Sequence, residues 1–185
     1  MLCISQTGTN PYFNIAADEY LFRTFDEDIF RIYINSPSVI IGKHQNPYKE
    51  INYRFIRQEN IAVVRRISGG GAVYQDLGNV NFTFITTVKN EKPVNFRKYT
   101  LPVIKFLKKN GISASFEGKS NVTIDGLKIS GNAEHVFKNR VLHHGTLLFS
   151  SRLKNLAKAL IPSTLPYQTN AVQSIRSRVT NISQY

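Results

Sequence analysis

The chain has 185 residues, of which 24 are Lys or Arg and 12 are Asp or Glu, so its formal net charge is +12. This length is typical of one domain whose core needs no disulfide or metal, and the lone Cys3 excludes an internal disulfide. The charge favours an anionic ligand or partner, but the basic residues form no run longer than two, which argues against a nucleic-acid-binding tail. Because neither a signal peptide nor a membrane-length apolar segment is recognisable, we expect a cytoplasmic protein without a membrane partner.

The first half of the chain predicts one helix followed by a series of strands. Segment 14–25 has the apolar spacing of a helix and includes Ile15 on its apolar side. Further elements are expected, in order, as strands 30–35 and 39–42, a short helix 53–59, and strands 61–66, 72–75 and 80–86. In the last of these, Val80, Phe82 and Phe84 alternate with polar residues, as on a half-buried strand.

The second half begins with an amphipathic helix at 99–109, where Tyr99, Val103, Phe106 and Leu107 form the apolar stripe. It continues with strands 114–116, 122–124, 128–137 and 141–149, a hairpin turn at Asp125-Gly126, and a last helix over Leu153, Leu156, Ala157 and Leu160 that Pro162 ends. Strands outnumber helices and follow one another as hairpins. The sequence therefore predicts an α/β (α+β) fold of mixed or antiparallel sheets with packed helices, rather than a doubly wound parallel sheet.

The strongest local motif is the run of three glycines, Gly69-Gly70-Gly71, directly after a predicted strand. Glycines let the backbone approach a ligand closely, and their N–H groups can form an anion-binding nest. Arg65 and Arg66 precede the run and add permanently charged donors. The alternative is a flexible hairpin loop beside a solvated arginine pair.

A second polar motif lies on the predicted strand 128–137. Alternation places Lys128, Ser130 and Asn132 on one face and Ile129 on the other, so the polar face has the chemistry to bind an anion. The alternative is an ordinary exposed strand face. The nearby Gly118-Lys119-Ser120 does not form a phosphate-binding P-loop, because the required glycine is missing and a strand follows.

Two adjacent histidines, His143 and His144, fall on the predicted strand 141–149. Neighbouring residues on a strand face opposite sides, so the pair is not suited to chelating one metal. We expect one of them to line a pocket while the other packs or meets solvent. No metal ligands are assigned.

Taken in order, these motifs resemble those of the lipoate-protein ligase A family. The resemblance is carried by Pro11-Tyr12-Phe13-Asn14-Ile15-Ala16, Gly42-x-x-Gln45-Asn46-Pro47, Arg66-x-Ser68-Gly69-Gly70-Gly71-Ala72-Val73-Tyr74, Asp76-x-Gly78-Asn79, Lys128-x-Ser130-Gly131-Asn132-Ala133, His143-His144-Gly145-Thr146 and Ser174-x-Arg176-Ser177-Arg178. It implies the fold of the biotin and lipoate ligase superfamily. It also implies a two-step reaction, in which lipoate and MgATP give lipoyl-adenylate and an acceptor lysine then displaces AMP.

The resemblance also implies roles for individual residues. Lys128 is the expected catalytic residue, contacting the lipoate carboxyl group and the α-phosphate. Binding of the lipoyl-adenylate or ATP is expected of Arg66, Ser68, Gly69, Gly70, Gly71, Tyr74, Asn79, Lys128 and Ser130, and the lipoyl pocket is expected around Ile15, Tyr33 and His144. The cofactors implied are ATP and Mg²⁺.

Several positions depart from the family pattern. Lys119-Ser120-Asn121 stands where Arg-Asn-Asp is typical, and Gln75 stands where many members have His. The loss of the carboxylate at Asn121 weakens any role there in holding Mg²⁺ or the reacting lysine, and Lys119 lacks the bidentate geometry of an arginine. The roles of these four residues are left open.

Domain organisation is expected as a catalytic domain at 1–165, followed by a C-terminal segment or linker at 166–185. Many bacterial members continue into a small accessory domain, which makes that domain a candidate partner. The expected acceptors are acidic lipoyl domains of 2-oxoacid dehydrogenase or glycine-cleavage proteins, which would suit the +12 charge.

Other activities remain as alternatives. One is a lipoyl-adenylate or octanoyl transferase without efficient adenylation, although Cys3 lies outside every matching motif and therefore disfavours thiol-based transfer. A more distant alternative is a basic nucleic-acid-binding domain. No nucleic-acid motif supports it, and nucleic acid is not an expected partner.

Overall fold

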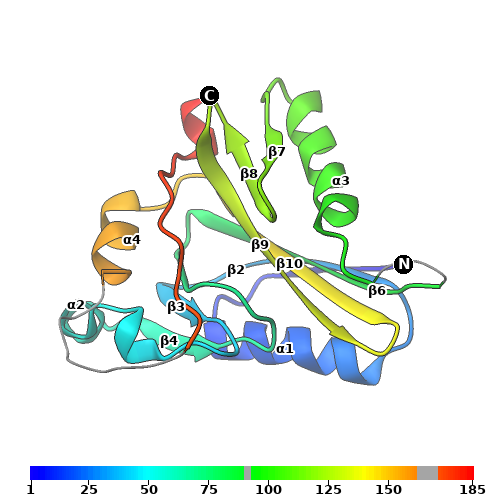
Figure 1. The fold of residues 1–185 in the computed structure, drawn as a ribbon, viewed down its shortest axis with the longest axis horizontal. Coiled ribbons are helices and arrows are strands. Elements are labelled where there is room, and N and C mark those ends of the chain that lie inside the picture. Colours follow the sequence, from blue (N-terminus) through cyan, green and yellow to red (C-terminus); the bar gives the residue numbers. More distant parts are fainter. Residues whose placement is uncertain (90–92, 162–170) are drawn as a thin grey trace.

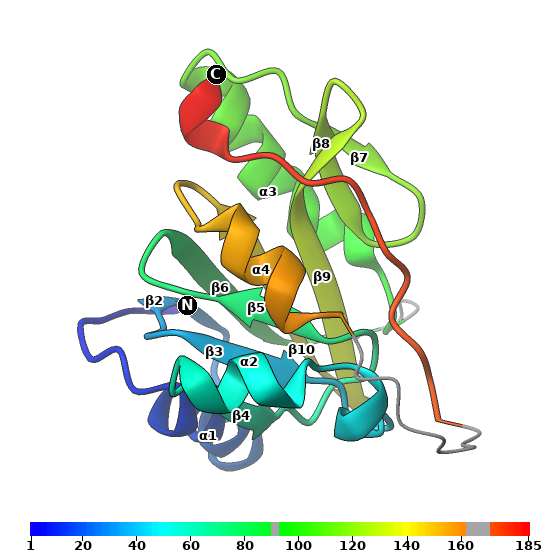
Figure 2. The same cartoon turned by 90° about the vertical axis from the view of Figure 1, so that its left-hand side faces the viewer.

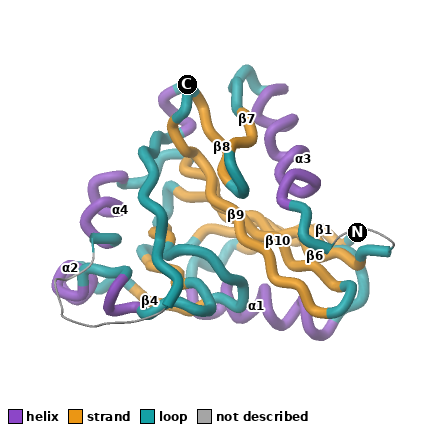
Figure 3. Tube along the Cα trace, in the orientation of Figure 1, coloured by secondary structure: helices purple, strands orange, loops and turns teal. Residues whose placement is uncertain are grey.

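The computed structural model describes residues 1–89, 93–161 and 171–185, and it contains two sheets and four α-helices (Figures 1 and 3). The strands are β1 (Leu2–Gln6), β2 (Ile29–Ile34), β3 (Ser38–Ile41), β4 (Ala62–Arg65), β5 (Val73–Gln75), β6 (Asn79–Thr87), β7 (Ser115–Glu117), β8 (Asn121–Ile124), β9 (Leu127–Phe137) and β10 (Arg140–Leu148). The helices are α1 (Pro11–Thr24), α2 (Tyr53–Gln58), α3 (Phe96–Lys109) and α4 (Leu153–Ala159), with 3₁₀ turns at Pro47–Lys49 and Ile182–Gln184. No helix within the described ranges combines the length and apolar composition needed to cross a membrane.

The larger sheet has the strand order β1-β2-β6-β10-β9-β8-β7 and is antiparallel except for the parallel pair β1 and β2. The smaller sheet has the order β4-β3-β5, with β3 parallel to β4 and antiparallel to β5. The mixed, hairpin-rich architecture predicted from the sequence is therefore confirmed. Helix α1 packs against strands of both sheets, and α3 covers β7 and β9 (Figure 1).

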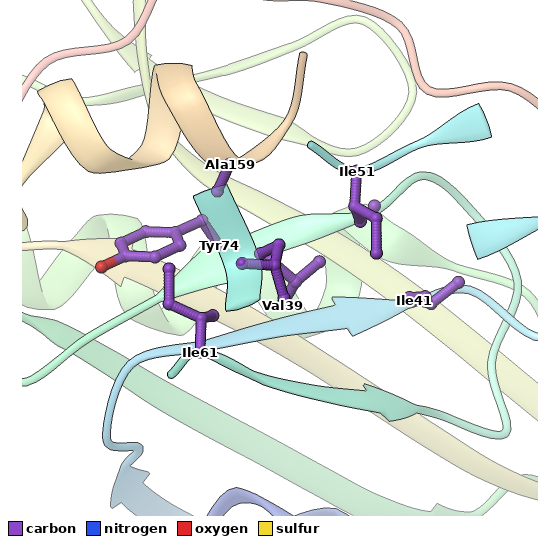
Figure 4. Close-up of a cluster of buried hydrophobic side chains, with 8 residues drawn as sticks. Val39, Ile41, Ile51, Ile61, Tyr74 and Ala159 are labelled. Carbon is purple, nitrogen blue, oxygen red and sulfur yellow. The ribbon is translucent and has the colours of Figure 1, made fainter. Parts of the chain in front are cut away.

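The main core cluster lies on the smaller sheet, where α2 and α4 cover it (Figure 2). Val39, Ile41 and Tyr74 from its strands meet Ile51 and Ala159, as Figure 4 shows. Burying this many aliphatic side chains fixes the smaller sheet, and with it the glycine-rich loop that joins β4 to β5. That loop is the part of the fold on which the site depends.

Helix starts differ from the predictions because asparagine caps lie further upstream. The Asn10 side chain accepts hydrogen bonds from backbone N–H groups of α1, and Pro11 follows at the first helical position. Helix α1 therefore begins three residues before the predicted residue 14. Asn95 caps α3 in the same way, so α3 begins at Phe96, three residues before the predicted 99. In α3 the predicted apolar stripe is wrong at Phe106, which is 63% exposed.

One bulge changes the side-chain pattern of β9. The pairing of β8 with β9 shifts so that Val122 faces Ser130 while Thr123 faces Lys128, which leaves Ile129 as the extra residue. Ile129 turns into the core beside Val122, opposite to the polar face, as predicted. The turn at Asp125-Gly126 is also confirmed, since both residues have positive φ angles of 50° and 72°.

The two ends of the chain extend the larger sheet. Strand β1 was not predicted from the sequence, because it is a mostly exposed edge strand with little apolar alternation. Residues 171–179, here called the C-terminal segment, run beside β9 with α4 on their other side (Figures 1 and 2). Val179 forms a parallel bridge with Lys128, and Ile182 is buried in a core cluster. Pro162, the predicted end of the last helix, lies outside the described residues.

Candidate active site

Two adjoining cavities lie between β9, β10, the start of β5 and the C-terminal segment. The first has a volume of about 530 Å³ and the second, which runs beneath α4, about 360 Å³. They meet along a set of residues that lines both cavities: Ala72, Val73, Lys128, Gly131, Thr146, Ser174, Ile175 and Ser177. Both walls expose more apolar than polar surface, and their described linings contain no carboxylate side chain.

Lys128 is the one charged side chain among the described residues that line both cavities. Its backbone N–H donates to the Arg178 carbonyl, and its own carbonyl accepts from Thr180, which fixes the start of its side chain. The side chain then crosses Gly131, where a Cβ atom would come within 3.1 Å of Nζ. Within the described parts of the chain no acceptor binds Nζ, and burial lowers the pKa of this lysine. A lysine side chain without a partner among the described residues therefore lies at the junction of the cavities.

The glycine-rich loop takes its shape from Arg66. The guanidinium donates hydrogen bonds to Ser68 Oγ (3.0 Å) and to the carbonyl oxygens of Ile40 (3.0 Å), Gly69 (2.7 Å) and Gly71 (2.8 Å). Burial lowers the pKa of Arg66 to about 10. Most donors of this arginine are therefore used by the loop itself, so Arg66 acts first as a brace for the cavity wall.

A buried ion-pair network supports the part of the first cavity away from the junction. Asp18 accepts hydrogen bonds from Arg31 Nη1 (2.7 Å), Tyr33 OH (3.1 Å) and Thr83 Oγ1 (2.9 Å). His144 Nδ1 lies 3.5 Å from Asp18 Oδ2. Tyr33 and His144 line the cavity, and burial together with the Asp18 carboxylate raises the pKa of Tyr33 well above its usual value. The lining thus rests on a charged layer behind it.

His144 also joins this network to the glycine-rich loop. Its Nε2 lies 2.6 Å from Ser68 Oγ, and Ser68 in turn accepts from Arg66. Ser68 is fully buried and lines neither cavity. Polar contacts therefore run from Asp18 through His144 and Ser68 to Arg66 and the backbone of the loop, so the two walls of the cavity are positioned together.

The C-terminal segment closes one side of both cavities. Ser174 Oγ accepts from the Ala72 N–H (2.8 Å) and from Gln45 Nε2 (3.1 Å), and donates to the buried Glu50 carboxylate. Gly71 lies directly beneath it, since a Cβ atom there would come within 2.9 Å of Ser174 Oγ. The segment is thus anchored on the glycine-rich loop.

The site residues predicted from the sequence fall into two groups. Those that line a cavity are Ile15, Tyr33, Arg66, Gly70, Gly71, Gln75, Lys119, Ser120, Asn121, Lys128 and His144 in the first, with Tyr74 and Ser130 in the second. Ser68, Gly69 and Asn79 are not among the lining residues. Asn79 is fully buried and donates to Asn81, which does line the first cavity.

Of the two adjacent histidines, one lines a cavity and the other packs in the interior, as the sequence predicted. His144 lines the first cavity, and His143 is fully buried on the other side of β10. His143 stacks on Tyr99, and its ring nitrogens lie 2.9 Å from Glu134 Oε1 and 3.2 Å from Asn132 Oδ1. Across the described residues, no three His, Cys, Asp or Glu side chains gather in a way that could hold a metal ion.

Sequence reasoning missed the polar residues behind the cavity wall. Asp18 and Arg31 were not singled out, although Arg31 alternates with Ile29 and Tyr33 on the inward face of β2. A charge on the apolar face of a strand is a usable signal, because such a residue must be paired when it is buried. Asn14 and Asn35 gave no comparable signal, since their burial depends on contacts between distant segments.

Comparison with known families and proteins identifies the family of this chain. The family model described as the lipoyl protein ligase A/B catalytic domain matches residues 10–185. Lipoate-protein ligase LplJ of Bacillus subtilis is 44% identical over 188 residues, which cover 100% of this chain and 57% of that protein. The chain thus spans a little over half the length of this relative.

Solved structures with the same fold include two lipoate-protein ligases and one protein solved with lipoate. The Plasmodium falciparum LipL1 complex with lipoate has a TM-score of 0.79 at 33% identity, covering 86% of this chain and 51% of that one. The bipartite ligase of Thermoplasma acidophilum, described with its E2 lipoyl domain, has a TM-score of 0.86 at 28% identity and covers 100% and 75%. A lipoate-protein ligase A bound with ATP has a TM-score of 0.83 at 26% identity and covers 100% and 78%. The family model and these matches establish that the chain belongs to the lipoyl protein ligase A/B catalytic domain family.

Proposed function

We propose that this chain is the catalytic domain of an ATP-dependent lipoate-protein ligase. It activates lipoate as lipoyl-adenylate and transfers the lipoyl group to a lysine of an acceptor lipoyl domain. The observation that carries the proposal is the position of Lys128, whose ammonium group stands between two cavities large enough for an acyl chain and a nucleoside. The relatives named as lipoate-protein ligases, and neighbours solved with lipoate and with ATP, support it.

The first step needs a cation at this junction. The carboxylate oxygen of lipoate attacks the α-phosphorus of ATP, an acyl–phosphate bond forms, and pyrophosphate leaves. Two negative charges about 4 Å apart repel each other by about 4 kcal/mol at an effective dielectric near 20. The Lys128 ammonium offsets this repulsion and stabilises the charge that develops on the phosphate oxygens. In the second step the acceptor amine attacks the acyl carbon and AMP leaves.

The two cavities suit the two halves of the intermediate. Ile15, Tyr33 and Ile40 give the first cavity an apolar wall for the lipoyl chain, with His144 beside them. The second cavity has leucines from α4 on one side and Arg176 on another, so we assign the adenosine part to it. Tyr74 and Ser130 would then face the nucleotide.

The remaining predicted residues take supporting roles in this proposal. Gly70 and Gly71 lie close to the acyl-adenylate, while Arg66, Ser68 and Gly69 hold the shape of the glycine-rich loop. Asn79 acts through Asn81. Lys119 and Ser120, just before β8, and Asn121 at its start line the first cavity, and the Asn132 side chain donates a 2.8 Å hydrogen bond to the Ser120 carbonyl.

The cofactors proposed are ATP and Mg²⁺. Magnesium prefers oxygen ligands and usually keeps waters and nucleotide phosphates in its coordination sphere. Because the described cavity linings offer amide and hydroxyl oxygens but no carboxylate, the ion would be held mainly by the triphosphate, with Ser120 and Asn121 as the nearest protein oxygens on the loop.

The partners proposed are acidic lipoyl domains of 2-oxoacid dehydrogenase or glycine-cleavage proteins, in the cytoplasm. A ligase neighbour described together with its E2 lipoyl domain supports this class of acceptor. A C-terminal accessory domain remains a further proposed partner, because relatives extend well beyond the length of this chain.

Intact-mass spectrometry of a lipoyl acceptor domain tests the proposal. After incubation with the chain, MgATP and lipoic acid, the acceptor should gain one lipoyl group, and Lys128→Ala should abolish the gain while the protein stays folded. Lys105→Ala removes an exposed lysine of α3 and serves as the matched control with wild-type turnover. Wild-type turnover by Lys128→Ala would contradict the role of Lys128.

A second arm separates complete ligation from transfer alone. If supplied lipoyl-adenylate modifies the acceptor but lipoic acid with MgATP does not, the chain transfers a preformed adenylate without making it. Modification from lipoic acid and MgATP establishes both steps.

A further inference from the structure

A row of three buried amides leads from Arg31 to the wall of the first cavity. Arg31 Nη2 donates to Asn14 Oδ1 (2.6 Å), Asn14 Nδ2 donates to Asn35 Oδ1 (2.8 Å), and Asn35 Nδ2 donates to Gln75 Oε1 (2.7 Å). All four side chains are buried, at 0–4% exposure. The row connects α1, β2 and β5, which are separate elements of the fold.

The direction of these hydrogen bonds is fixed by the arginine. A guanidinium has only N–H donors, so the oxygen of Asn14 must face it. Asn14 Nδ2 also donates to the carbonyls of Gly8 and Ile34, which excludes the flipped amide. Asn35 Oδ1 accepts from Asn14 Nδ2, so Asn35 Nδ2 is left to donate to Gln75 Oε1. The Gln75 amide is therefore oriented with its oxygen toward the protein interior.

The other end of that amide belongs to the cavity. Gln75 lines the first cavity, and none of the described residues accepts a hydrogen bond from its Nε2. Tyr33 and His144, which contact Asp18, line the first cavity with Gln75, and none of the three lines the second cavity. An oriented, neutral N–H donor thus stands on a part of the first cavity's lining that the second cavity does not share.

We propose that Gln75 is a specificity-determining residue that favours acids whose tail carries a hydrogen-bond-accepting heteroatom, such as the sulfurs of a dithiolane, over a plain alkyl acid. This inference rests on the proposed function. Divalent sulfur is a weak acceptor, but a buried donor left without any partner costs more than an average hydrogen bond gains. An octanoyl tail offers no acceptor and leaves Nε2 unsatisfied. A lipoyl tail gives it a partner.

Calorimetric titration of lipoic acid and octanoic acid measures the preference directly, without requiring adenylation. In Gln75→Leu the donor is replaced by an apolar group of similar size. We expect the ratio of the octanoic to the lipoic dissociation constant to fall about five-fold from its wild-type value. Thermal unfolding of the variant verifies that it is folded.

A second variant tests the amide row without touching the ligand. Asn35→Asp removes the N–H that holds Gln75 Oε1, so the Gln75 amide turns to donate to the new carboxylate and presents its oxygen to the cavity. The same fall in the ratio is expected. Asn52→Asp makes the same chemical change at the N-cap of α2, where Asp caps equally well, and should leave the ratio unchanged.

The outcomes separate this inference from the proposed function. Binding of both acids with a ratio that stays within two-fold of wild type in Gln75→Leu and in Asn35→Asp overturns the role of Gln75 and leaves the ligase proposal standing. Failure of the wild-type chain to bind either acid overturns both.

Discussion

Asp18 is the residue on which the rear wall of the first cavity depends, and its ionisation links stability to pH. Burial by itself would raise the pKa of this carboxyl group, but His144 and Arg31 outweigh burial and hold the pKa below the usual 3.8. A lowered carboxyl pKa in the folded state means that the unfolded chain binds the proton first as pH falls. The stability contributed by Asp18 is therefore present above about pH 4 and is lost as pH falls through the folded pKa.

Asp18→Asn should destabilise the protein at neutral pH. It leaves the Arg31 guanidinium buried without its counter-charge, a change that costs about 3 kcal/mol in buried pairs. Urea unfolding should give a free energy of unfolding far below that of wild type at neutral pH, and a smaller difference from wild type near pH 3. Asp125→Asn, in an exposed turn that tolerates Asn, is the control with no loss at either pH. Equal losses for Asp18→Asn at both values would contradict the linkage.

Single residues also mark how far the sequence predicts the site. Lys128, the glycine run and His144 could be singled out from local patterns, because Lys128 and His144 are titratable residues on predicted strands and the glycine run directly follows one. The residues behind them could not. Asn35 meets Gln75 across 40 positions of sequence, and nothing near either residue indicates the contact.

At the scale of elements, the contact between the glycine-rich loop and the C-terminal segment decides whether the cavities are closed. Gly71→Ala places a methyl group within about 3 Å of Ser174, so the segment must move outward. Gly69→Ala is the matched control, because a Cβ atom at Gly69 meets nothing within 4 Å. Hydrogen exchange over residues 172–178 should become faster in Gly71→Ala and stay at the wild-type rate in Gly69→Ala. Identical exchange in the two variants would show that Gly71 does not anchor the segment.

Some element boundaries were predictable from local signals. The Asp125-Gly126 turn and the stop of α3 just before Gly111 follow from residues that tolerate positive φ, whereas the caps Asn10 and Asn95 were missed although they are also local. The bulge at Ile129 was not predictable, because it arises from how β8 pairs with β9. Strand β1 is held by its pairing with β2, so its short sequence alone carried no indication of it.

At the scale of the whole molecule, the net charge of +12 bears on how the proposed acidic acceptor would find the site. Electrostatic attraction between a basic enzyme and an acidic domain raises the association rate, and salt weakens it by shortening the screening length from about 10 Å at 0.1 M to about 3 Å at 1 M. Because attraction over such distances depends on summed charge, substitution of any one exposed lysine should change it little.

The dependence of acceptor modification on salt tests this last expectation. The value of kcat/KM for an acidic lipoyl domain should fall about ten-fold between about 50 mM and 500 mM NaCl, because encounter is the step that screening slows. Hydroxylamine, a small uncharged nucleophile, replaces the acceptor in the control reaction and should show little salt dependence, since it needs no electrostatic attraction. A parallel fall in both reactions would place the salt effect on adenylation or on the fold. A flat response with the lipoyl domain would mean that the positive charge serves another purpose than attracting the acceptor.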